Sequence, residues 1–293
     1  MDIVPTGVSL HAHADDHTIK LSFQGGYIVH ERSGVKILEE TLAAINTWME
    51  ENRLQMNNNK TEFIFFGTRQ QLNKCSTRAI SACNVSVPVS KQVKYLGVYL
   101  DSELSLNTHV MKKCQVAMMN VCRLRNIRYA LTIDTAKILA SALILPHLDY
   151  ANAILYGLPK KTLNMIQRIQ NITAKLVLQK KKSDSATQCL KTLHWLPCRL
   201  RIKYKIILLV FKCMHGLAPE YLCSLLKPRL FGNHDLRTTM NDSVDLEIPR
   251  TKAKTLADRS FRIAGPTLWN SIPVEMKKID NLTTFKTNLK TYL

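Results

Sequence analysis

Apolar and polar residues alternate near the start of the chain. Ile19, Leu21 and Phe23 are separated by polar residues, which is the two-residue period of a strand with one face buried. An apolar segment and an acidic break precede this run, and two glycines follow it. The pattern predicts a hairpin over residues 8–23 with acidic residues at its turn.

A helical period follows the hairpin. Over residues 36–53 apolar side chains recur at spacings of three and four, while most of the glutamates fall on the other side, which predicts an amphipathic helix. Further strands are predicted at residues 62–66, near residues 85–89 and near residues 93–100. This order of strands around one helix is typical of an α+β fold.

Beyond about residue 105 the period is helical throughout. Helices are predicted over residues 105–127, 133–149, 160–180, 185–193 and 199–215, with prolines between them. Residues 227–256 are polar and aperiodic and predict a loop or extended arm, followed by short helices at 256–264 and 282–292. We therefore expect three parts: residues 1–103, a helical region over 104–226, and a basic arm with a helical tail over 227–293.

Charge changes at the same boundary. The chain carries 41 Lys and Arg against 22 Asp and Glu, a net charge of +19. Residues 1–100 hold 10 basic and 9 acidic residues, so the excess lies almost wholly in the helical part. A positive field of this size attracts polyanions through phosphate contacts and counterion release. Nucleic acid is the first candidate partner and an anionic membrane surface the second.

Cysteine spacing argues against a zinc site. The eight cysteines form no CxxC pair, and His194 and His215 lie near three of them without ligand spacing, so we expect reduced thiols and no zinc. No run of about 18 apolar residues and no secretory signal is visible, so we expect neither a membrane span nor secretion.

The sharpest chemical feature is the pair Asp15-Asp16 between the two strand-like runs. Adjacent carboxylates at a tight turn supply the hard oxygen ligands that divalent cations prefer. Aspartate also favours turns for ordinary hydrogen-bonding reasons, so the pair alone is a weak signal.

Three motifs in order make the signal more specific. They are His13-Ala14-Asp15-Asp16, then Asn57 to Phe66 with Lys60-Thr61-Glu62 entering a strand, then Tyr95-Leu96-Gly97-Val98. This order resembles the polymerase palm of reverse transcriptases of non-LTR (LINE-type) retrotransposons. Later segments resemble the C-terminal region of the same family: Leu148–Asn152, Leu193–Pro197, His215–Pro219 and Gly265–Pro273.

The resemblance implies roles for particular residues. Asp15 and Asp16 would bind Mg²⁺ or Mn²⁺, and Lys60 would lie near the triphosphate of a deoxynucleotide. Tyr95, Leu96 and Gly97 would position the primer end. The helical region would act as a thumb on a duplex of RNA template and DNA primer, with the basic residues Lys112, Lys113, Arg123, Arg125 and Arg128 as candidates. Without the resemblance, the simpler interpretation of each of these residues is a surface charge or an ordinary hairpin residue. For Trp195 and Trp269, the neighbouring Leu and Pro residues favour core packing over base stacking.

The same resemblance implies a limit on activity. Position 13 is His where the family has an aromatic residue, and a palm of this type needs a further Asp from an earlier strand, which we expect to lie outside this chain together with the fingers. We therefore expect a reverse transcriptase fragment that is not catalytic alone. The alternatives are a non-catalytic RNA- or DNA-binding protein and a decayed element. Nuclear or mixed nuclear and cytoplasmic placement is expected, because such elements copy themselves at chromosomal DNA.

Overall fold

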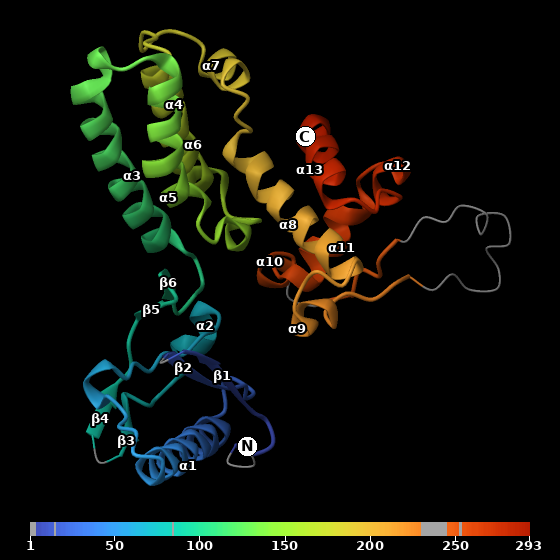
Figure 1. Cartoon of the computed structure of the whole chain (residues 1–293). Coiled ribbons are helices and arrows are strands. Elements are labelled where there is room, and N and C mark those ends of the chain that lie inside the picture. Colours follow the sequence, from blue (N-terminus) through green and yellow to red (C-terminus); the bar gives the residue numbers. More distant parts are fainter. Residues whose placement is uncertain (1–3, 15, 84, 230–244, 252–253) are drawn as a thin grey trace, which may run out of the picture. The chain divides into compact units, whose positions relative to one another are not determined.

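The computed structural model describes residues 4–14, 16–83, 85–229, 245–251 and 254–293 (Figure 1). It divides into two compact units, residues 1–109 and 110–293, which we treat separately as unit 1 and unit 2. Unit 1 mixes short strands with helices, and unit 2 is helical. The α+β fold class is confirmed. The segment from residue 227 onward does not separate as a unit of its own.

Unit 1 contains three two-stranded antiparallel sheets and one long helix. Its elements are β1 (Val8–His13), β2 (Asp16–Leu21), α1 (Ile28–Glu51), η1 (Asn58–Lys60), α2 (Arg69–Leu72), β3 (Ala79–Ala82), β4 (Val85–Pro88), β5 (Gln92–Tyr95) and β6 (Val98–Asp101). Within each sheet, consecutive strands pair: β1 with β2, β3 with β4, and β5 with β6. The hairpin expected over residues 8–23 is confirmed, and α1 begins earlier than the apolar period predicts.

One face of α1 covers the core of unit 1. The buried side chains are Phe63, Phe65, Ile80, Ala82 and Val87, with partly buried residues such as Phe23, Leu38 and Leu42 packed against them. Gly34 lets α1 approach the β1–β2 hairpin closely, because a Cβ at this position would lie 3.2 Å from the Phe23 ring.

Two strand predictions are wrong in detail. Residues 62–66 form no strand ladder; Phe63 makes an isolated parallel bridge with Val89. The single strand expected over residues 93–100 is instead the β5–β6 hairpin, because Leu96 (φ 45°) and Gly97 (φ 77°) turn the chain back on itself. Alternation marks the apolar face in both segments, but a strand exists only where a partner pairs with it.

A buried carboxylate holds the loop before β3. Glu31 is 3% exposed and accepts hydrogen bonds from the backbone N–H groups of Ser76 (2.9 Å) and Thr77 (2.7 Å). Burial alone raises the pKa of Glu31, but the hydrogen bonds from Thr77 and Ser76 outweigh it, so this pKa lies below its usual 4.5. The ionised carboxylate therefore stabilises unit 1.

Unit 2 begins within α3, the long helix that follows β6, and contains most of the helices that the structure describes. In order they are α3 (Asn107–Ile127), η2 (Arg128–Ala130), α4 (Ile133–Leu143), α5 (Leu145–Asp149), η3 (Asn152–Leu155), α6 (Lys160–Val177), α7 (Ala186–Thr192), α8 (Cys198–Met214), α9 (Glu220–Cys223), α10 (Lys254–Ala257), α11 (Phe261–Asn270), α12 (Val274–Lys277) and α13 (Leu282–Tyr292). The helices predicted over residues 105–127, 160–180, 185–193, 199–215 and 282–292 are confirmed within a few residues. Two predictions are wrong in detail: 133–149 divides into α4 and α5, with Pro146 in the first turn of α5, and 256–264 is not one helix but spans the break between α10 and α11.

Helix α8 forms the centre of unit 2. Its residues Ile206, Ile207, Val210 and Phe211 are almost completely buried, and Phe211 stacks on Phe285 of α13 at 4.1 Å between ring centroids. Trp195 and Trp269 are 8% and 1% exposed. Core packing, rather than base stacking, is therefore the role of both tryptophans.

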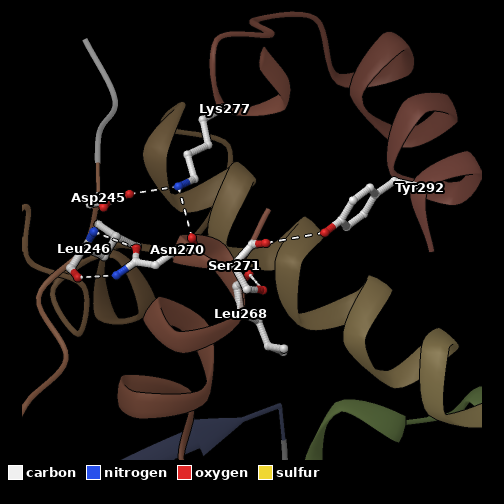
Figure 2. Close-up of polar contacts among 7 residues, drawn as sticks. All are labelled: Asp245, Leu246, Leu268, Asn270, Ser271, Lys277 and Tyr292. Atoms are coloured by element: carbon white, nitrogen blue, oxygen red, sulfur yellow. Dashed lines mark hydrogen bonds and ion pairs between the residues drawn. The ribbon is translucent and has the colours of Figure 1, made fainter. Parts of the chain in front are cut away.

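Residues 245 and 246 are fixed to α11 and to Lys277 (Figure 2). The Asn270 side chain accepts from the N–H of Leu246 (2.9 Å) and donates to its carbonyl (2.8 Å), as a neighbouring strand would. The Lys277 side chain is only 4% exposed, and its Nζ binds the Asp245 carboxylate at 2.8 Å. Most of the arm predicted over residues 227–256 lies outside the described residues.

Candidate nucleic-acid interface

The acidic turn belongs to the β1–β2 hairpin. His13 and Asp16 are partners in the register, and Ala14 has φ 54°, so the chain reverses between them. Asp16 is exposed at the start of β2. Asp15 lies outside the described residues. The sequence assignment of Asp15 and Asp16 as a metal-binding pair therefore remains a prediction.

The acidic turn lies near the β5–β6 hairpin within unit 1. The His13 ring centroid is 6.3 Å from that of Tyr95, in an edge-on arrangement. Tyr95 leads directly into the Leu96-Gly97 turn, and Leu96 is 40% exposed. Two motifs that are about eighty residues apart in the sequence are thus neighbours in the fold.

Lys60 ends the short η1 turn and is exposed. Its backbone N–H donates to the carbonyl of Asn57 at 3.0 Å. Within the described residues, no hydrogen bond or ion pair joins its ammonium group to Asp16. The nucleotide-binding role of Lys60 remains a prediction from the resemblance.

Sequence reasoning did not find the role of Asp101. Its carboxylate accepts from the N–H groups of Ser105 (2.8 Å) and Leu106 (2.7 Å), which shapes the turn before α3. The signal present in the sequence is weak: Asp101 is an acid ahead of a predicted helix, and aspartate often accepts hydrogen bonds from nearby backbone N–H groups. Across the residues that the structure describes, no group of three His, Cys, Asp or Glu side chains is arranged to hold a metal ion.

The basic residues proposed for α3 differ in their surroundings. Lys112, Arg123 and Arg125 are exposed, and Arg123 donates to Asn120 at 3.3 Å one turn earlier. Lys113 is half-buried, with its ammonium 4.7 Å from the centre of the Tyr150 ring. Such a contact favours the cation but leaves it partly accessible to a phosphate.

Arg128 is a correction to the sequence interpretation. It is 4% exposed, and its guanidinium donates to the carbonyls of Leu176 (3.1 Å), Val177 (2.6 Å) and Leu131 (2.6 Å). Leu176 and Val177 end α6, whose last carbonyls have no partner within the helix. Arg128 therefore caps α6 and joins it to the α3–α4 connection; it is not placed to grip nucleic acid.

Charge follows the division into units. Residues 1–109 hold 10 Lys and Arg against 11 Asp and Glu, a net of −1. Residues 110–293 hold 31 against 11, a net of +20. The whole basic character of the chain belongs to the helical unit.

Comparisons with known proteins identify no relative. No protein-family model, no curated protein and no solved structure matches the chain. The resemblance to non-LTR reverse transcriptases thus depends on the motifs quoted above. No helix in the described part of the chain is both long enough and apolar enough to cross a membrane.

Proposed function

We propose that unit 2 is a nucleic-acid-binding module and that the chain is the C-terminal part of a non-LTR reverse transcriptase. The observation that carries the proposal is the separation of charge, +20 on unit 2 against −1 on unit 1. Each cation that neutralises a phosphate releases condensed counterions, so such a surface binds nucleic acid with little dependence on sequence.

Helix α3 supports the proposal with accessible cations. Lys112, Arg123 and Arg125 lie on its exposed surface, and Lys113 is only partly covered by Tyr150. Cations on one long helix can contact successive phosphates of a duplex, which is the thumb-like role that the resemblance implies.

Titration of a labelled RNA–DNA duplex with the full chain at several salt concentrations tests the proposal. Binding should weaken as salt rises, and the triple substitution of Lys112, Arg123 and Arg125 by Gln should lower the slope of log Kd against log salt by about 0.9 for each phosphate that no longer has a cation. A matched triple substitution of the exposed Lys36, Lys74 and Lys91 in unit 1 by Gln should leave the slope unchanged. Salt-insensitive binding, or an equal decrease in the slope for the unit 1 variant, would refute the proposal.

A second candidate function is template-directed DNA synthesis, supported by the proximity of the acidic turn to Tyr95. In this proposal Asp15 and Asp16 supply part of a site for Mg²⁺ or Mn²⁺, and a further acid on another segment completes it, because two-metal transfer needs both metals held in line with the reacting phosphate. Primer extension on an RNA template tests it, with a palm segment that carries the further acid added in trans. We expect extension by the mixture and none by this chain alone; no extension by the mixture, or extension that persists when Asp15 and Asp16 are both changed to Asn, would refute the assignment.

A further inference from the structure

An exposed aromatic ring lies at the connection between α3 and α4. Tyr129, in η2, is 86% exposed, the most exposed large hydrophobic residue among those described. Within the described part of the chain, its side chain makes no hydrogen bond or ring contact. A single exposed tyrosine is ordinary, so what matters is which groups surround it.

Arg128 links the connection that carries Tyr129 to the end of α6, where a run of lysines follows. Its bonds to the carbonyls of Leu176 and Val177 fix η2 against the end of α6. Lys180, Lys181 and Lys182 follow directly and are all exposed. Figure 1 shows the α3–α4 connection and the chain between α6 and α7 at the same end of these helices.

The lysine run has a defined backbone. The N–H of Lys180 donates to the carbonyl of Lys175 (2.9 Å), and the Nζ of Lys175 donates to the carbonyl of Lys182 (2.7 Å). The N–H of Lys181 donates to the Asp184 carboxylate at 2.8 Å. These bonds hold the three lysines together in a compact turn.

We call the group Tyr129, Lys180, Lys181 and Lys182 the basic end. The acids nearest to it in the chain are Asp134, exposed in the first turn of α4, and Asp184, whose carboxylate already accepts the Lys181 N–H. Along these two connections, cations therefore exceed acids.

An aromatic platform among cations matches the chemistry of a single strand. Bases of a single strand have free faces that stack on aromatic rings, while the phosphates follow a basic groove or ridge. In a duplex those faces are already covered by neighbouring bases. We propose that the basic end binds single-stranded RNA or DNA, with Tyr129 stacking on a base and the three lysines contacting neighbouring phosphates. The inference rests on the proposed function, since it assumes that unit 2 binds nucleic acid, and it adds a second surface for a different form of the ligand.

Binding of a short labelled oligouridylate and of an RNA–DNA duplex by the full chain tests the inference. Tyr129→Ala should weaken oligouridylate binding by about tenfold, the effect of losing one stacked base, while Tyr129→Phe retains binding. Tyr221→Ala is the matched control, because Tyr221 is also exposed, at 68%, but lies on α9. Duplex binding should be the same for all three variants.

A charge series tests the lysines. Replacing Lys180, Lys181 and Lys182 by Gln should lower the slope of log Kd against log salt by about 0.7 per neutralised phosphate on the oligouridylate, about 2 in all. Replacing the exposed Lys286 and Lys290 of α13 by Gln should change it much less. Circular dichroism should show that each variant keeps its helices.

The outcomes separate the two proposals. If the duplex binds with normal salt dependence while Tyr129→Ala and the lysine variant bind oligouridylate like the unchanged protein, the basic end is refuted and the proposed function stands. If the unchanged protein binds neither ligand, both are refuted. A third outcome would overturn the inference: the Tyr129 and lysine variants no longer bind vesicles containing phosphatidylserine but bind oligouridylate like the unchanged protein. The basic end would then bind a lipid surface and not a single strand.

Discussion

Replacing Arg128 by Met separates a structural cation from a binding cation. The substitution keeps an unbranched side chain of similar length but removes three charge-assisted hydrogen bonds to the carbonyls of Leu131, Leu176 and Val177. A hydrogen bond to a charged group contributes about 1.5–3 kcal/mol, and a buried carbonyl left without a partner costs about 1–3 kcal/mol. Because the bonds share one guanidinium and are not additive, we expect a loss of about 3–5 kcal/mol in the free energy of unfolding of unit 2.

Urea denaturation followed by tryptophan fluorescence measures this loss. Trp195 and Trp269 are both buried in unit 2, so a Trp48→Phe background confines the signal to that unit. Arg125→Met is the matched control, since Arg125 is exposed in the last turn of α3, one turn before Arg128, and its loss should cost no more than about 0.5 kcal/mol.

The reasoning fails if Arg128→Met and Arg125→Met destabilise unit 2 equally, or if Arg128→Met costs less than about 1 kcal/mol. Duplex binding provides a second test. At a temperature where both variants are folded, Arg125→Met should reduce the salt dependence of binding and Arg128→Met should leave it unchanged.

Three further predictions concern stability and thiol chemistry. Glu31→Gln should destabilise unit 1 by about 1–3 kcal/mol. Because the pKa of Glu31 is lowered in the folded protein, the carboxylate should stabilise unit 1 fully above pH 4.5 and lose this effect as the pH falls through the folded-state pKa. Urea denaturation at a series of pH values measures this, and an effect of the substitution that does not depend on pH would contradict it. Asn270→Ala should remove both side-chain hydrogen bonds to Leu246, so hydrogen exchange of the Leu246 amide should accelerate by about tenfold or more. Exchange within α8 should stay slow. An unchanged exchange rate at Leu246 would show that Asn270 does not hold this segment. Cys122 is exposed, whereas burial raises the pKa of Cys198 to about 12, so a thiol reagent should modify Cys122 first, and peptide mass spectrometry that finds Cys198 modified first would refute this order.

The sequence predicts the helices of unit 2 well because their apolar periods are long. In α6, buried residues such as Leu163, Ile166, Ile169 and Val177 recur at helical spacing, and prolines mark where the helices begin. A local signal of this kind does not depend on distant partners.

Strand pairing and the accessibility of charged side chains are harder to predict, because both depend on residues that are distant in the sequence. The alternating Phe63 and Phe65 reach the core of unit 1, yet their segment finds no ladder, only a bridge. Arg128 has the same sequence character as Arg125, but one is buried under carbonyls at the end of α6 and the other is exposed. The three-dimensional neighbours of an arginine, not its position in a helix, determine whether it is available to a phosphate.

The proximity of His13 to Tyr95 was not predictable from the sequence. The two residues are about eighty positions apart, and only the fold of unit 1 brings their rings together. The positive φ at Leu96, which forms the turn, follows no residue preference, since such a backbone is normally left to Gly or Asn.

Photo-crosslinking tests the central claim, that unit 2 carries nucleic-acid binding, most directly. The full chain would be crosslinked to an RNA–DNA duplex and to an oligouridylate carrying photoreactive uridines, and the modified peptides would be identified by mass spectrometry. We predict crosslinks within residues 110–293, on α3 with the duplex and on the peptide containing Tyr129 with the oligouridylate. Crosslinks confined to residues 1–109 would contradict the account.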